Sequence, residues 1–144
     1  MINRNTNPII KLEVSKLDSN KVYKRLNELN REIDEKQQEY DYCNSDRTDA
    51  QASLMDIEEE LEDLEERRSE LFYYSYGEED EELEELEELE DDINWLDNDR
   101  MELEIEIKSL TAELKNIAKD LNRLKTEREQ LTDQLFDYHR KGEC

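Results

Sequence analysis

The side chains of this chain that could carry chemistry are mostly carboxylates, and they gather in one segment. Between Asp56 and Glu106 there are 26 acidic and 3 basic residues, which gives this segment a net charge of −23. The whole chain has 43 acidic and 20 basic residues, also a net of −23, so everything outside the segment balances at 17 against 17. Carboxylates at this density could collect metal ions, serve as acids or bases, or present an electrostatic surface to a basic partner.

The other parts of a catalytic or metal site are missing from the sequence. The one histidine, His139, stands in a basic stretch suited to the last turn of a helix, so we expect it to cap that helix. The two glycines, Gly77 and Gly142, cannot form a glycine-rich phosphate loop, and neither cysteine nor histidine spacing suits zinc. The acids at 97 and 99 lack the glycine and spaced ligands of a calcium loop. We therefore expect no enzyme, no cofactor and no metal site.

Two long heptad series would position the carboxylates. One runs from Val22 to Leu71, and the second runs from Leu86 to Tyr138. A heptad repeat that continues this far without interruption predicts a coiled coil rather than a disordered acidic chain. The first series consists of Val22, Leu26, Leu29, Ile33, Lys36, Tyr40, Cys43, Arg47, Ala50, Leu54, Ile57, Leu61, Leu64, Arg68 and Leu71. The second consists of Leu86, Leu89, Ile93, Leu96, Arg100, Leu103, Ile107, Leu110, Leu114, Ile117, Leu121, Leu124, Arg128, Leu131, Leu135 and Tyr138.

A glycine separates the two series and predicts a hairpin. Gly77 suits a helix C-terminal cap, and the acids that follow it suit the first turn of a new helix. The expected fold is all-α: one domain with an extended segment at 1–17, a first coiled-coil helix at 18–76 and an antiparallel second helix at 77–141. Facing residues should have numbers that sum to about 157, or to 150 in a register one heptad shorter.

Three stretches leave alternatives open. Residues 41–49 are poor helix formers, so we expect a continuous helix with a soft spot there, the alternative being a break that gives three helices. Asp18 is the expected N-cap of the first helix. Residues 8–14 alternate in the manner of a strand that pairs with a partner or a second copy, although a flexible tail or a segment that lies on the coiled coil fits equally well.

No stretch is long and apolar enough for a membrane span, and the N-terminus lacks the apolar core of a signal peptide. We therefore expect a soluble protein without membrane contact, located in the cytoplasm, or in the host cytoplasm if the protein is viral.

The density of charge predicts the kind of partner. Folded into a hairpin, the 51 residues from Asp56 to Glu106 occupy about 38 Å of helix axis. The net of −23 is then about one charge per 1.7 Å, close to the density of duplex DNA. We expect a non-catalytic protein that binds and inhibits a basic, nucleic-acid-binding partner by mimicking this charge, as small acidic proteins of phages and mobile elements do as a class. The sign of the charge argues against direct nucleic-acid binding.

The predicted partner-binding surface is collective. It comprises Glu58, Glu59, Glu62, Asp63, Glu65, Glu66, Glu78, Glu79, Asp80, Glu81, Glu82, Glu84, Glu85, Glu87, Glu88, Glu90, Asp91 and Asp92. Two other functions remain open: a structural coiled-coil spacer whose glutamates only solvate it, and a regulator that inserts an acidic hairpin tip into an enzyme channel.

Apolar residues outside the two series predict two further contacts. An aromatic turn of Phe72, Tyr73, Tyr74 and Tyr76 would either plug the end of the hairpin or anchor a partner. Apolar residues on the outer faces suggest a homodimer in which two hairpins pack together as four helices. The expected dimer interface contains Met55, Trp95, Met101 and Ile105.

Overall fold

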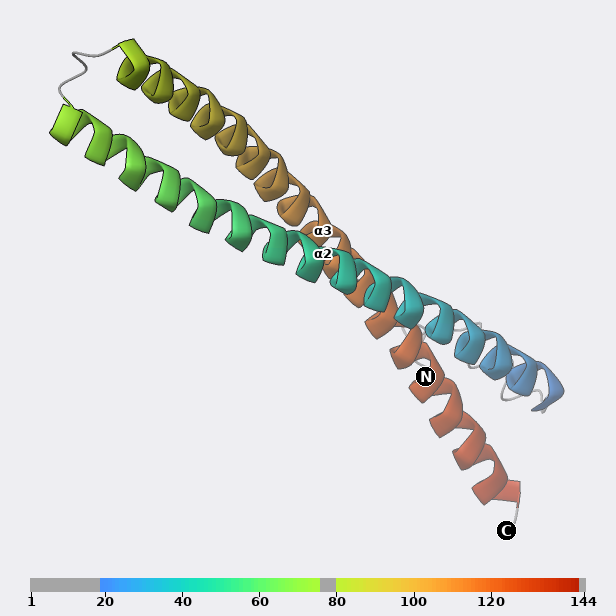
Figure 1. Cartoon of the computed structure of the whole chain (residues 1–144). Coiled ribbons are helices and arrows are strands. Elements are labelled where there is room, and N and C mark those ends of the chain that lie inside the picture. The colour runs from blue at the N-terminus through green and yellow to red at the C-terminus, as the bar shows by residue number, and fades with distance from the viewer. Residues whose placement is uncertain (1–18, 76–79, 143–144) are drawn as a thin grey trace, which may run out of the picture. The chain divides into compact units, whose positions relative to one another are not determined.

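The computed structural model describes residues 19–75 and 80–142 and contains two long helices that pack against each other (Figure 1). Helix α2 spans Ser19–Ser75, 57 residues, and helix α3 spans Asp80–Gly142, 63 residues. The predicted all-α helical hairpin is confirmed. The predicted extended segment, the cap at Asp18 and the turn at Gly77 lie outside the described residues.

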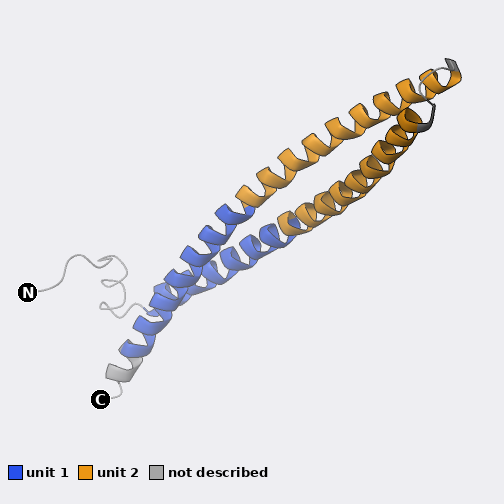
Figure 2. Ribbon diagram, turned by 90° about the vertical axis from the view of Figure 1, so that its left-hand side faces the viewer, with its two compact units in different colours: residues 1–42, 114–144 blue, residues 43–113 orange. Residues whose placement is uncertain are grey.

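The chain divides into two compact units, and each contains one segment of α2 and one of α3 (Figure 2). Unit 1 comprises residues 1–42 and 114–144, and unit 2 comprises residues 43–113. The acidic segment from Asp56 to Glu106 therefore belongs wholly to unit 2.

Helix α2 continues without a break through the predicted soft spot at 41–49, so the alternative of three helices is wrong. Local hydrogen bonds occupy the polar side chains there. The Thr48 hydroxyl donates to the backbone carbonyl of Asn44 at 2.9 Å, and Arg47 donates to the side-chain oxygen of Asn44 at 3.1 Å. Such bonds satisfy polar side chains within the helix, so the stretch stays helical despite its low intrinsic propensity.

The core follows the two heptad series. Every position of the first series is buried or half-buried, and so is every position of the second from Leu86 to Leu135. No residue outside the series is among the buried apolar side chains of the described part of the chain. These side chains are Val22, Leu29, Ile33, Cys43, Ala50, Leu61, Leu89, Ile93, Leu114, Ile117, Leu121, Leu124, Leu131 and Leu135. The burial pattern is that of a coiled-coil seam.

Two of the charged seam residues, Lys36 and Arg100, direct their charged groups to flanking carboxylates. The Lys36 ammonium lies 3.1 Å from the Glu39 carboxylate and 3.7 Å from that of Asp120, and its hydrogen bond to Glu39 is the main cause of its raised pKa. Arg100 pairs with Asp97 one turn earlier in α3. Long aliphatic stems thus fill the seam while the charges reach flanking carboxylates.

Cross-helix contacts bear on the register of the two helices. The Cys43 thiol donates to the backbone carbonyl of Leu110 at 3.6 Å, and these residue numbers sum to 153. The ion pair of Lys36 with Asp120 gives a sum of 156, and the other cross-helix pairs give sums from 152 to 158. The predicted sums of 157 and 150 therefore stay predictions. The heptad pattern does not decide between them, because each register buries the same residues.

Burial also determines the state of the Cys43 thiol. Desolvation is the main cause of its raised pKa, and the nearby charge of Glu113 adds to the effect. The raised pKa favours the neutral thiol, which behaves as a small apolar side chain in the seam.

Candidate functional site

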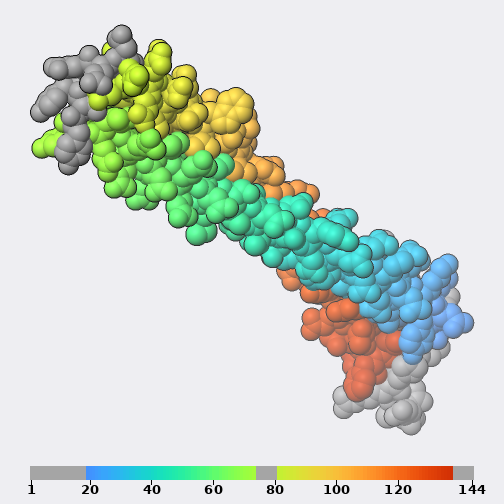
Figure 3. Space-filling view, viewed as in Figure 1, coloured from blue at the N-terminus to red at the C-terminus, as the bar shows by residue number. Residues whose placement is uncertain are grey.

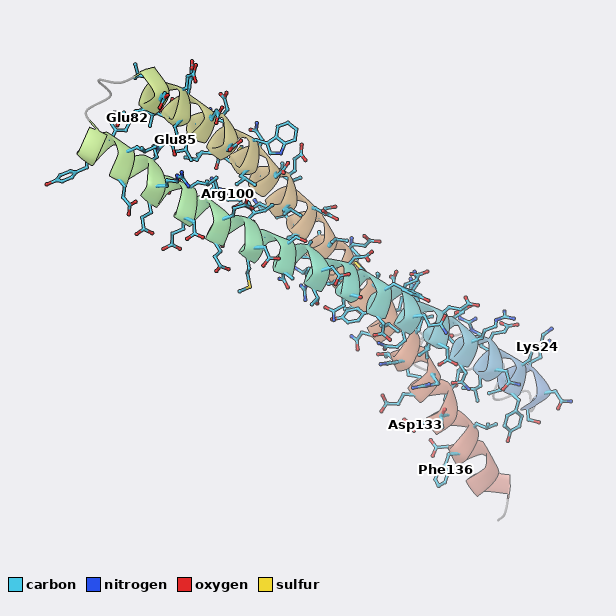
Figure 4. All side chains as sticks on the ribbon, viewed as in Figure 1. Lys24, Glu82, Glu85, Arg100, Asp133 and Phe136 are labelled. Carbon is cyan, nitrogen blue, oxygen red and sulfur yellow. The ribbon has the colours of Figure 1, made fainter. Side chains whose placement is uncertain are left out.

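The structure places the predicted acidic surface on the outside of unit 2, on both of its helical segments. Glu82 and Glu85 are half-buried, and Figure 4 shows them on the first turns of α3. Glu78 and Glu79 lie outside the described residues, as does the side chain of Asp80. The exposed members are Glu58, Glu59, Glu62, Asp63, Glu65 and Glu66 on α2, and Glu81, Glu84, Glu87, Glu88, Glu90, Asp91 and Asp92 on α3.

The heptad pattern explains why these carboxylates point outward. Apolar residues such as Leu61, Leu89 and Ile93 occupy the seam and are buried. The acids fill the positions between them, which a two-helix coiled coil leaves in solvent or at the edge of the seam. The acidic surface is therefore a direct consequence of how the seam is folded.

Most of this negative charge has no basic partner. Arg67 and Glu85 form an ion pair across the two helices at 2.5 Å, and Arg100 pairs with Asp97 and, at 3.9 Å, with Glu104. Among the described residues between Asp56 and Glu106, the other carboxylates form no ion pair. Most of the negative charge on this surface is therefore not neutralised by a neighbouring cation. Its electrostatic field extends several ångströms into the solvent and attracts positive charge.

The sequence analysis singled out Glu85 but not its ion pair with Arg67. Each residue directly precedes a seam position, Arg68 or Leu86. Arg68 and Leu86 occupy the same heptad position, and the residues that precede this position flank the seam and meet across an antiparallel coiled coil, so this spacing was the available signal.

The predicted aromatic turn is exposed where the structure describes it. Phe72 is 61% and Tyr73 73% exposed. Tyr76 and the side chain of Tyr74 lie outside the described part. The residues predicted for a dimer interface also face solvent: Met55, Trp95, Met101 and Ile105 are 69%, 71%, 52% and 67% exposed.

The described residues form no enclosed site. Asp63, Arg67 and Glu85 help to line a depression between the two helices of unit 2, but this depression is open to solvent. In the space-filling view of Figure 3, side chains fill the space that separates the two helix ribbons in Figure 1. No group of three or more acidic, histidine or cysteine side chains in the described ranges is arranged to hold a metal ion.

Comparisons with models of protein families, with curated proteins and with solved structures find no match for this chain. In the described ranges, no helix is long and apolar enough to cross a membrane.

Proposed function

We propose that this protein binds a basic, nucleic-acid-binding protein through the acidic surface of unit 2 and blocks its nucleic-acid site by imitating the charge of duplex DNA. The observation that carries this proposal is the exposure of carboxylates on both helices with few compensating cations. A helical hairpin offers no cavity in which a carboxylate could be desolvated for catalysis, so the surface acts through its summed field.

The dimensions support imitation of a duplex. With the helices antiparallel, the acidic segment carries its net charge of −23 over about 38 Å of axis. Duplex DNA of the same length holds about eleven base pairs with a similar charge per unit length. Two adjacent helices, each about 10–12 Å across, also approach the breadth of a duplex. A cleft that fits DNA would therefore find comparable width and charge on this surface.

Competition with DNA tests the proposal. We expect the immobilised protein to retain nucleic-acid-binding proteins from a lysate of its own cell type. Free duplex DNA should release them at a lower concentration than polyglutamate does, when both competitors are compared at equal numbers of negative charges. The reason is that polyglutamate has the charge of a duplex without its shape. Mass spectrometry identifies the proteins, and the two elution curves are compared. Bound proteins that duplex DNA fails to release, or releases no better than polyglutamate, would contradict the proposal.

The exposed rings near the hairpin end favour a second candidate, a regulator that inserts its tip into a channel of an enzyme. Phe72 and Tyr73 lie in the last described turns of α2 and face solvent. Aromatic residues of this kind often anchor interfaces.

Substitution of the two rings separates the candidates. Under DNA imitation, Phe72→Ala and Tyr73→Ala should change the affinity for the captured partner by less than about threefold, because a collective charge surface does not depend on two rings. Insertion of the tip instead predicts a loss of about 2 kcal/mol or more, roughly thirtyfold, for at least one ring. Titration calorimetry with the purified partner measures the difference, and Tyr42→Ala, an exposed aromatic far along the sequence from the turn, is the control.

A further inference from the structure

The outer side of α3 carries a second heptad-spaced stripe, opposite the seam. Alternating steps of three and four from Glu84 to Asn122 select residues that all lie outside the first seam and are all exposed. We call this set the outer stripe. It consists of Glu84, Glu87, Asp91, Asn94, Asn98, Met101, Ile105, Lys108, Ala112, Lys115, Lys119 and Asn122.

Charge changes sign along the outer stripe. The acids stand at 84, 87 and 91, and the lysines stand at 108, 115 and 119. Neutral residues occupy the middle, with Met101 and Ile105 at the centre, 52% and 67% exposed. None of these six charged side chains forms an ion pair with another described residue. The stripe therefore has an apolar centre with unpaired charges of opposite sign on its two sides.

The charges of the outer stripe are complementary to those of a second copy when the two α3 helices run antiparallel. If Met101 of one copy lies opposite Ile105 of a second copy, facing residues have numbers that sum to 206. Asp91 then faces Lys115, and Glu87 faces Lys119. The same two pairs occur again on the other side of the axis, because a two-fold interface repeats every contact. Four acid–lysine pairs thus flank an apolar centre.

A parallel arrangement lacks this complementarity. It would place Glu87 beside Glu87 and Lys115 beside Lys115, and would bring two segments of net charge −23 side by side. Like charges at facing positions destabilise paired elements. The antiparallel arrangement instead separates the two acidic segments.

We propose that a second copy of this chain covers the outer stripe, so that the protein forms an antiparallel homodimer whose two-fold axis passes between Met101 and Ile105. Burial of the exposed Met101 and Ile105 side chains supplies the apolar contribution, and the acid–lysine pairs set the direction and register. Trp95 lies one position from the stripe, at the level of Thr111 of the second copy. The carboxylates of α2 stay outside this contact and remain available to the partner of the proposed function.

Charge reversal gives a direct test by sedimentation equilibrium near physiological salt. The unchanged chain should be dimeric at high micromolar concentration. The double variant Glu87→Lys/Asp91→Lys, and separately Lys115→Glu/Lys119→Glu, should each weaken the dimer at least about tenfold, because four pairs become repulsive. An equimolar mixture should recover a dimer of one chain of each kind, since every facing pair is then again of opposite sign. Circular dichroism verifies that both variants remain helical.

The first variant separates local pairing from general repulsion. It changes the net charge from −23 to −19, so repulsion between whole chains would predict a tighter dimer rather than a weaker one. Glu62→Lys/Glu66→Lys on α2 makes the same change of charge outside the stripe and should leave the dimer intact. The inference is overturned if the unchanged chain is a monomer at every concentration, if either stripe variant dimerises as before, or if mixing restores nothing. These outcomes depend on the chain alone, so they are independent of whether the proposed partner exists.

Discussion

Removal of six exposed carboxylates from α3 is expected to weaken binding of the basic partner at least about tenfold, whereas removal of six exposed carboxylates from unit 1 should change it by less than about threefold. Exposed ion pairs contribute about 0.2–1 kcal/mol each. Six of them therefore total at least about 1.2 kcal/mol, close to the 1.4 kcal/mol of a tenfold change. The α3 variant replaces by amides six carboxylates that lie outside the outer stripe: Glu81, Glu88, Glu90, Asp92, Glu102 and Glu106.

The unit 1 variant is matched in charge. Both variants change the net charge from −23 to −17, and both alter only exposed side chains that form no ion pair with described residues. The unit 1 variant replaces Asp34, Glu35, Asp41, Glu129, Asp133 and Asp137 by amides. Calorimetric titration at about 50 mM and 500 mM salt should show the difference at low salt and reduce it at high salt, because salt screens exposed charges. Equal losses in the two variants would mean that only the total charge matters, and would contradict a localised binding surface.

Truncation of Leu29 should cause a large loss of stability. Its side chain is 0% exposed, one of the most deeply buried in the described part of the chain. Leu29→Ala removes buried methyl groups and leaves a cavity in a narrow seam, which costs about 2–5 kcal/mol. Urea unfolding followed by circular dichroism measures the free energy of unfolding. The midpoint should move to lower urea concentration without a change of slope.

An exposed leucine provides the control for that measurement. Leu83 is 47% exposed and outside the heptad series, so Leu83→Ala should cost less than about 1 kcal/mol. Similar losses for the two variants would mean that the seam at Leu29 is not the core of unit 1.

The hairpin could be predicted because its cause is local and repetitive. Seam positions from Val22 to Leu71 and from Leu86 to Leu135 recur at every third or fourth residue, and the structure leaves none of them exposed. The soft spot at 41–49 also follows from such reasoning, since phase is preserved across it and α2 remains unbroken. The outward position of the acids could also be predicted, because they occupy the heptad positions between those of the seam.

The register could not be predicted in this way. Cys43 faces Leu110 because of how the side chains of the two helices interlock, and a sliding of three or four residues leaves the same residues in the seam. The pairing of Arg67 with Glu85 depends on that register as well. Phe72 and Tyr73 follow Leu71, the last position of the first series, so the heptad pattern does not predict their exposure.

The helices, their buried sides and the concentration of charge at 56–106 follow from the order of the residues, because each is a property of residues within a few turns of one another along one chain. Which residues face each other across the seam, and which carboxylates pair with a cation, follows instead from the packing of the two helices. Such contacts join residues as far apart in the sequence as Arg25 and Glu127. The periodicity of a single helix contains no information about which of these distant residues meet.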